Sequence, residues 1–422
     1  MDNVTHALAG GLLAAATITY INTRIESRID RASGATDATM QRTATVLGVV
    51  AAELPDADLL YSGPLLDMGK LGYLLHHRGH THTVVFALAA ALLLWGIAML
   101  VRPTLRAPAS RMPLLVLAVV GTLSHLALDY TNSYGVHPFW PFNSSWFYGD
   151  AVFIVEPWLW VVALIPLVFV YRSRGARVLL GALLAIILAA SWSVDLVARW
   201  VAIALTVVAI AWMLIMRVTP LARRAAYGLL AWCVVEAGFF ASSHVARTLV
   251  RKTVGDTTLR DAVLSPAVGD PFCYRALVVE LDDGEYRVSA ATVAPFARLR
   301  DVSACTASAG GRGAIAGDST ATLRRVSDRH VRWEGQWSAP ASELVALAHS
   351  RCEIAAALQF VRVPIWRTLP DGTLRLADLR FGEGDGFSTI DVPPASEPCP
   401  TAVPGWRPPR RDIIGAAVAG SE

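Results

Sequence analysis

Long apolar segments fill roughly the first 245 residues and are separated by short polar connections. A helix that crosses a membrane needs about 20 mostly apolar residues. Six segments fit this pattern: Val84–Val101, Met112–Leu128, Ala151–Tyr171, Val178–Val194, Trp200–Met216 and Ala225–Ser242. Two weaker ones, Thr5–Ile21 and Thr43–Leu54, bring the expected total to about eight. Thr43–Leu54 is short enough to be a re-entrant or protein-covered helix.

After Arg251 the pattern changes to short alternating runs separated by turn residues. Two pairs of runs flank Asp-Asp-Gly-Glu and Pro-Asp-Gly-Thr, and each pair is predicted to form a β-hairpin. The pairs are Ala276–Leu281 with Tyr286–Val293, and Val361–Leu369 with Leu374–Phe381. Val331–Trp337 is predicted to be another strand, and Ser342–Ala357 a helix.

These patterns predict a mainly α protein, a polytopic transmembrane bundle with a small β-rich (α+β) extramembrane domain. Four parts are expected along the chain. They are a membrane core at 1–150, further membrane helices at 151–250, the β-rich domain at 251–392 and an extended Pro-rich tail at 393–422.

Composition and charge agree with an integral membrane protein. The 422 residues are 54% hydrophobic and only 17% charged, which is too apolar for an ordinary soluble protein of this length. The net charge of +3 argues against a nucleic-acid binder. The N-terminus lacks a basic n-region, so export is expected to depend on the first membrane helices and not on a cleaved signal peptide.

Arginine residues mark alternate connections between the apolar segments. The arginine-rich connections carry Arg24, Arg28, Arg31, Arg42, Arg102, Arg106, Arg111, Arg172, Arg174, Arg177, Arg217, Arg223 and Arg224. The other connections carry only Lys70, Arg78 and Arg199. Under the positive-inside rule the arginine-rich connections face the cytoplasm, and both termini lie outside the inner membrane.

Histidine and aspartate residues gather at the helix ends opposite these arginines. The set comprises His6, Asp56, Asp58, His76, His77, His80, His82, His125, Asp129 and His137. His125 and Asp129 are four residues apart and share one helix face. Imidazole and carboxylate are ligands for zinc, manganese or iron. The sequence therefore predicts a metal site at the extracytoplasmic face of the membrane.

Residues 1–150 resemble the YdjM-like family of membrane-bound, metal-dependent hydrolases. The matching pieces are Met1-Asp2…Thr5-His6…Gly10, Leu54-Pro55-Asp56-Ala57-Asp58, His77-Arg78-Gly79-His80-Thr81-His82, and Ser124-His125…Asp129…Thr131…Gly135…Trp140-Pro141-Phe142. The family is thought to be related to zinc-dependent phospholipases C and P1-type nucleases, which hydrolyse phosphoesters.

The resemblance implies a set of roles for these residues. The implied metal ligands are His6, Asp56, Asp58, His77, His82, His125 and Asp129. Asp56 or Asp58, where it is not a ligand, would be the general base, and Arg78 would stabilise anionic charge. Asp2 is a candidate carboxylate partner of a ligand histidine. His76 and His80 are neighbours of the motif, and His137 is expected to be a loop residue. Asp150 and Glu156 either reach the site or are ordinary acids at a helix N-terminus.

The leading interpretation is an integral membrane hydrolase that uses one or more divalent ions, zinc before manganese or iron. It would cleave a phosphoester of a lipid or lipid-linked substrate at the outer face. One alternative is a metal- or proton-coupled transporter, for which Glu236 inside its apolar segment is a candidate. Another is a regulatory membrane protein with a structural metal.

Four of the five cysteines, Cys273, Cys305, Cys352 and Cys399, lie in the predicted β-rich domain, and Cys233 lies in a helix. In an extracytoplasmic domain the four are expected to form two disulfides, for which three pairings remain open. The alternative is four free thiols in a cytoplasmic domain.

Overall fold

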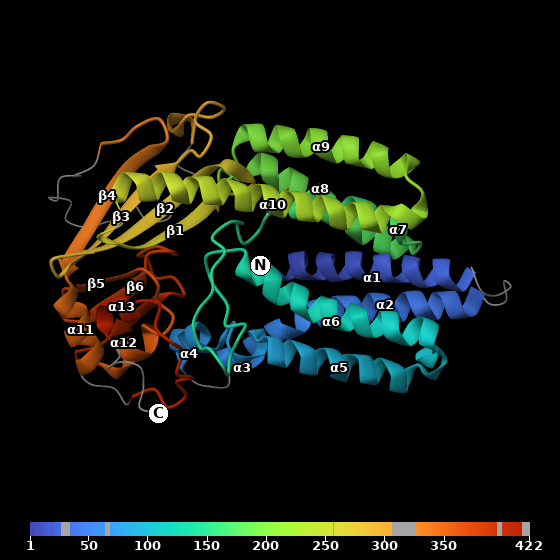
Figure 1. Ribbon diagram of the computed structural model, residues 1–422, viewed down its shortest axis with the longest axis horizontal. Coiled ribbons are helices and arrows are strands. Elements are labelled where there is room, and N and C mark those ends of the chain that lie inside the picture. Colours follow the sequence, from blue (N-terminus) through green and yellow to red (C-terminus); the bar gives the residue numbers. More distant parts are fainter. Residues whose placement is uncertain (27–33, 64–67, 256, 306–325, 395–398, 416–422) are drawn as a thin grey trace. The chain divides into compact units, whose positions relative to one another are not determined.

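The computed structural model describes all residues except 27–33, 64–67, 256, 306–325, 395–398 and 416–422 (Figure 1). Arg28, Arg31 and parts of the predicted Pro-rich tail therefore lie outside the described residues. The chain divides into two compact units whose segments alternate along the sequence. The first unit comprises Met1–Asp56, Thr81–Thr131 and Val152–Phe239, and the second comprises Ala57–His80, Asn132–Ala151 and Phe240–Glu422.

The first unit is helical, and each of the predicted membrane segments contributes a helix. Its helices are α1 (Asn3–Glu26), α2 (Gly34–Glu53), α5 (Val84–Val101), α6 (Pro108–Tyr130), α7 (Pro157–Val170), α8 (Arg174–Ser193), α9 (Arg199–Val218) and the first part of α10 (Leu221–Val254). Among the described residues, six helices are long and apolar enough to cross a membrane: α1, α5, α6, α8, α9 and α10. The predicted polytopic bundle is confirmed, with six such helices among the described residues against the predicted total of about eight segments.

One predicted membrane segment is shorter than expected. Ala151–Tyr171 was predicted to be helical throughout, but α7 begins only at Pro157 and has 14 residues. Proline lacks the amide hydrogen that an interior helical position needs and is favoured in the first turn. The Glu156 side chain caps this end by accepting a hydrogen bond from the Trp158 amide at 3.2 Å. The helix therefore starts where the cap and the proline place it.

Small residues allow α1, α2 and α6 to pack closely side by side (Figure 1). A Cβ atom added to Gly10 would lie 2.4 Å from the Gly48 carbonyl oxygen, and one added to Gly121 would lie 2.9 Å from the Ala51 Cβ. Membrane helices associate largely through such close backbone contacts, because lipid tails provide no hydrophobic force between helices. These contacts hold together the three helices that lead to the histidines and aspartates.

The Gly10 contact can be tested with a matched pair of substitutions. Gly10→Ala should lower the melting temperature of the purified protein in detergent, because its methyl group meets the α2 backbone and overpacking costs about 1–3 kcal/mol. Gly181→Ala in α8 is the control, because nothing lies within 4 Å of its added Cβ. Alanine is the better helix former by about 1 kcal/mol, so Gly181→Ala should be neutral or stabilising. Equal effects of the two substitutions would contradict this packing.

The second unit contains two antiparallel sheets. The first has the order β1 (Leu259–Ala267), β2 (Asp270–Asp282), β3 (Glu285–Val293) and β4 (Val331–Pro340). The second has the order β5 (Pro364–Thr368), β6 (Leu374–Asp378) and β7 (Thr389–Val392). The two predicted hairpins correspond to β2–β3 and β5–β6 and are confirmed. Strands β1 and β7 were not predicted.

Short helices complete the second unit. They are α3 (Leu59–Ser62), α4 (Gly69–His76), α11 (Ala341–Ser350), α12 (Cys352–Ala357) and α13 (Arg411–Ile414). The single helix predicted over Ser342–Ala357 is in fact α11 and α12, because Arg351 between them is extended, with φ −132° and ψ 109°. The extended residue interrupts the helical hydrogen bonds and lets the chain change direction.

Segments far apart in the sequence share the core of the second unit. Leu74 and Leu75 of α4 and Trp146 are buried in one cluster with Phe360 and Trp406. The Trp406 indole donates a hydrogen bond to the Leu75 carbonyl at 2.7 Å, and the Trp146 indole donates one to the Gln359 carbonyl at 2.7 Å. Residues 57–80 and 132–151 therefore pack with the C-terminal part of the chain.

Two disulfides join Cys273 to Cys305 and Cys352 to Cys399, with Cα–Cα distances of 5.6 Å in both. This selects one of the three possible pairings. Cys233 in α10 is the free cysteine.

Thiol labelling of denatured protein tests the pairing. Unreduced wild-type protein should be alkylated only at Cys233. Cys352→Ser should expose one further thiol, and peptide mass spectrometry should identify it as Cys399, because each broken bridge releases its own partner. Labelling of Cys273 or Cys305 in that variant would show that the pairing is wrong.

Candidate metal centre

Four elements bring together five of the predicted ligands within the first unit. His6 lies in the first turns of α1, and His125 and Asp129 lie four residues apart near the end of α6. Asp56 lies in the 3-10 turn η1 (Leu54–Asp58) directly after α2, and His82 ends the turn η2 (His80–His82). All five side chains are buried, and His6, His82, His125 and Asp129 are 0% exposed.

Local sequence explains where these turns fall. Helix α2 ends one residue before the Leu54-Pro55 step of η1, where proline disfavours continuation of the helix. Helix α5 begins directly after Thr83, whose side-chain oxygen accepts a hydrogen bond from the Phe86 amide at 3.1 Å. Threonine is a favoured N-cap residue. The end of α2 and the cap of α5 therefore place Asp56 and His82 at turns beside the last turns of α6.

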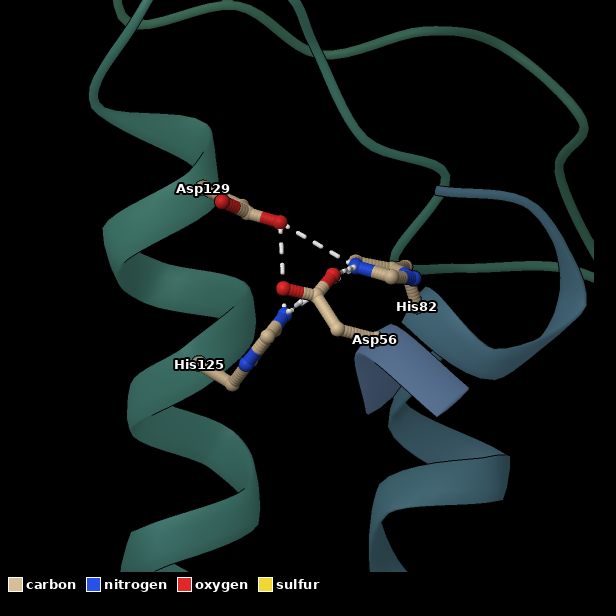
Figure 2. A group of neighbouring side chains, drawn as sticks. All are labelled: Asp56, His82, His125 and Asp129. Carbon is tan, nitrogen blue, oxygen red and sulfur yellow. Dashed lines mark hydrogen bonds and ion pairs between the residues drawn. The ribbon is translucent and has the colours of Figure 1, made fainter. Parts of the chain in front are cut away.

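Two imidazoles and two carboxylates converge on one point (Figure 2). His82 Nε2 lies 3.3 Å from Asp56 Oδ1 and 3.1 Å from Asp129 Oδ2. His125 Nε2 lies 3.4 Å from each of the same two oxygens. The two Nε2 atoms are 3.1 Å apart. Donors that bind one tetrahedral zinc ion at about 2.0–2.1 Å are about 3.3–3.4 Å from one another, so these spacings are close to those of ligands that share one ion.

Hydrogen bonds outside the cluster orient the histidine rings. His125 Nδ1 lies 2.6 Å from the Ala52 carbonyl oxygen. A carbonyl oxygen only accepts, so Nδ1 carries the hydrogen and the Nε2 lone pair faces the cluster. His82 Nδ1 pairs with the Thr81 hydroxyl at 3.0 Å. Metal-binding histidines typically make such a second hydrogen bond, because it fixes the tautomer and the ring orientation.

His6 borders the same cluster. Its ring stacks on His125 with centroids 3.7 Å apart, and its Nε2 lies 3.3 Å from Asp129 Oδ1. The Met1 amine also contacts Asp129. His6 Nε2 makes no hydrogen bond among the described residues beyond its ion-pair contact with Asp129, so its lone pair is available to a metal ion. His6 Nδ1 also has no hydrogen-bond partner there, unlike the Nδ1 atoms of His82 and His125.

The charge of the cluster favours a cation. Burial raises the pKa of Asp56, but the His125 and His82 imidazoles outweigh this effect and hold the pKa well below its usual range. Asp56 is therefore a carboxylate at neutral pH. An ionised carboxylate is costly to bury unless it is paired or coordinates a metal. The residues present fit a divalent ion in charge, in ligand type and in spacing.

Three further predicted site residues belong to the second unit. His77 Nδ1 lies 2.9 Å from Asp58 Oδ1, and the Arg78 amide donates to Asp58 Oδ2 at 2.9 Å. The Arg78 guanidinium donates to Asn132 Oδ1 at 3.1 Å and lies over the Tyr134 ring. Arg78 also has a positive φ of 60°. Hydrogen bonds to Asp58 thus join His77 and Arg78 within the second unit.

Asp2 and Glu156, the other acids predicted near the site, lie in the first unit and cap helices. Asp2 Oδ1 accepts a hydrogen bond from the Thr5 amide at 3.0 Å, and the Thr5 hydroxyl receives the Trp160 indole hydrogen at 3.0 Å. Glu156 caps α7. Asp2 therefore fixes the start of α1 just before His6.

Asp150 and three histidines have structural partners in the second unit. Asp150 pairs with Arg362 at 2.8 Å and with Arg247 at 2.9 Å. His76 Nε2 lies 2.8 Å from the Ala402 carbonyl oxygen. The His80 ring packs against the Trp140 and Trp406 rings, and the His137 ring packs against the Trp146 and Trp406 rings. The expectation that Asp150 is an acid at a helix N-terminus is wrong, because α7 begins only at Pro157 and Asp150 instead pairs with arginines 97 and 212 residues away in the sequence.

Glu236, on which the transporter alternative depends, accepts a hydrogen bond from the Trp232 indole at 2.9 Å. The two residues are one turn apart on α10, so the sequence provides the carboxylate with a local donor. The half-buried carboxyl group is therefore partnered within its own helix.

A buried set of imidazole and carboxylate ligands in a bundle of apolar helices defines a multi-pass membrane protein that could hold a metal ion. The sequence model of the YdjM inner membrane protein family matches residues 1–216, just over half of the 422 residues. The chain belongs to this family, and the resemblance noted in its first 150 residues is confirmed. Comparisons with curated proteins and with solved structures gave no match.

Removal of ligands should remove the metal. Purified His125→Ala and Asp129→Asn proteins should bind zinc at least about 100-fold more weakly than wild type, because each loses a group that points into the cluster. His349→Ala and Asp195→Asn are matched controls, since both side chains are exposed. Elemental analysis and zinc titration measure the change. Wild-type zinc binding in His125→Ala would exclude this ligand set.

Proposed function

We propose that the protein is a membrane-embedded, metal-dependent hydrolase whose metal centre consists of Asp56, His82, His125 and Asp129, with His6 as a further ligand. The observation that carries this proposal is the convergence of buried imidazole and carboxylate atoms at 3.1–3.4 Å from one another. A purely structural role would not explain so many buried ionisable groups, because well-packed apolar residues in their place often stabilise a fold equally well or better.

A divalent ion, zinc according to the ligand types and manganese or iron as alternatives, would provide an activated water and polarise the bond to be cleaved. Asp56 and Asp129 would balance its charge, and the Ala52 carbonyl holds His125 in the tautomer that presents Nε2. Asp58 would orient His77 through its 2.9 Å contact with Nδ1, which makes Asp58 a positioning residue more readily than a general base. Arg78 would stabilise anionic charge on the substrate.

The proposed substrate is a phosphoester of a lipid or of a lipid-linked molecule. Two observations support this choice. The cluster lies at ends of apolar helices, the depth at which headgroups are found in a bilayer. The arginine-rich connections are at the other ends of α5 and α6, so the positive-inside rule would place the site at the extracytoplasmic face.

Activity measurements test the proposal directly. Purified wild-type protein should release headgroup or phosphate from phospholipids or polyprenyl diphosphates in mixed micelles, and chelation should abolish this activity until zinc is restored. His82→Ala should reduce turnover by about 100-fold or more, whereas His349→Ala should retain it.

The same preparations separate the alternatives. Metal uptake into proteoliposomes that is lost in Glu236→Gln, without any hydrolysis, would favour a transporter. Bound metal with neither hydrolysis nor uptake would favour a structural metal. Chelator-insensitive hydrolysis that persists in His82→Ala would rule out the proposed centre.

A further inference from the structure

The second unit contains a basic pocket that the proposed hydrolase does not use. Its cavity has a volume of about 470 Å³, which is within the range of small-molecule sites. Five arginines line it: Arg260, Arg362, Arg407, Arg410 and Arg411. The acidic residues in its wall are Asp261 and Asp412. Two carboxylates against five guanidinium groups leave the lining with an excess of three positive charges.

The floor of this pocket is a fixed ion-pair network. Arg362 donates to both oxygens of Asp150 and, on its other edge, to both oxygens of Asp261, at 2.8–3.1 Å. Arg410 donates to the same Asp261 at 3.2 Å. Burial raises the pKa of Asp261, but Arg362 and Arg410 outweigh this and lower it. Asp150 and Asp261 are thus both ion-paired with arginines of the floor.

One buried guanidinium nitrogen in the floor has no hydrogen-bond partner among the residues that the structure describes. Arg410 is 7% exposed, yet its Nη1 makes no hydrogen bond in the described part of the chain. A buried donor without an acceptor is costly and points to a ligand that completes it. The rim residues Arg260, Arg407 and Arg411 are exposed, and no ion pair between them and another described residue is present.

We propose that this pocket is a binding site for a phosphate group, with Arg410 Nη1 as the buried donor and Arg407 and Arg411 as the rim. Guanidinium groups match the geometry of phosphate oxygens and retain their charge at every physiological pH. The excess of three positive charges matches a doubly or triply charged anion better than a single carboxylate. A soluble phosphate compound and a phosphomonoester lipid headgroup share this chemistry.

Binding to the full-length protein in detergent tests the site. Pyrophosphate titration by calorimetry measures the soluble source, and binding to nanodiscs with or without phosphatidic acid measures the lipid source. Arg407→Gln/Arg411→Gln should weaken the binding of at least one of these ligands by about tenfold or more, because two charge-assisted donors are lost. Arg298→Gln/Arg329→Gln is the matched control, since it removes two exposed arginines outside the pocket.

A third protein separates this site from the metal centre. His125→Ala should bind pyrophosphate or phosphatidic acid as wild type does, even where it has lost its metal. The proposal is overturned if neither ligand binds saturably, if the control pair weakens binding as much as the pocket pair, or if binding disappears in His125→Ala. It stands independently of the hydrolase, whose failure would leave these affinities unchanged.

Discussion

The burial of two carboxylates among the helices of the first unit is the constraint on which the candidate centre depends. An ionised carboxylate in an apolar interior costs several kcal/mol unless opposite charge and hydrogen bonds compensate it. Asp56 and Asp129 face the same two imidazole nitrogens, and a divalent cation would neutralise both acids at once. The surrounding helix ends and turns place the His82 and His125 imidazoles beside the two carboxylates.

Close helix packing and ligand placement are linked within the helices themselves. Gly10 lies one turn after His6 on α1, and Gly121 lies one turn before His125 on α6. Residues four apart share a helix face, so the face that touches α2 through glycine is the face that presents the ligand. The backbone contacts of these glycines thus determine how near His6, Asp56 and His125 approach. Bulkier residues would separate the ligands as well as the helices.

The helices and hairpins could be predicted from the sequence where a local pattern of apolar or turn residues marks them. The apolar segments predicted the helices, and the turns Asp-Asp-Gly-Glu and Pro-Asp-Gly-Thr predicted both hairpins. Ligand-type residues could be recognised from spacing, because His125 and Asp129 share a face whatever the tertiary structure is. The bounds of α7 were wrong because the Glu156-Pro157 start signal was outweighed by the apolar residues before it.

Prediction failed where the determining contact is distant in the sequence. Strand β1 was missed for a local reason instead: its partner β2 follows after two residues, but Pro266 lacks an amide hydrogen and argues against a strand. The role of Asp150 depends on Arg362, 212 residues away. The choice between three disulfide pairings depends on which Cα atoms the fold brings within 5.6 Å. The Asp150–Arg362 pair and the disulfides leave no periodic signal in the chain, because each is made between single positions.

The alternation of the two units along the chain has a consequence for biosynthesis. Leu75 and its hydrogen-bond partner Trp406 are separated by 331 residues. At a synthesis rate of about 5–20 residues per second, Trp406 is added to the chain roughly 17–66 s after Leu75. During that time the cluster that contains Leu71, Leu74 and Leu75 lacks the Trp406 ring. A stop codon before Trp406 would therefore remove a core side chain and the hydrogen bond to the Leu75 carbonyl from a segment synthesised more than 300 residues earlier.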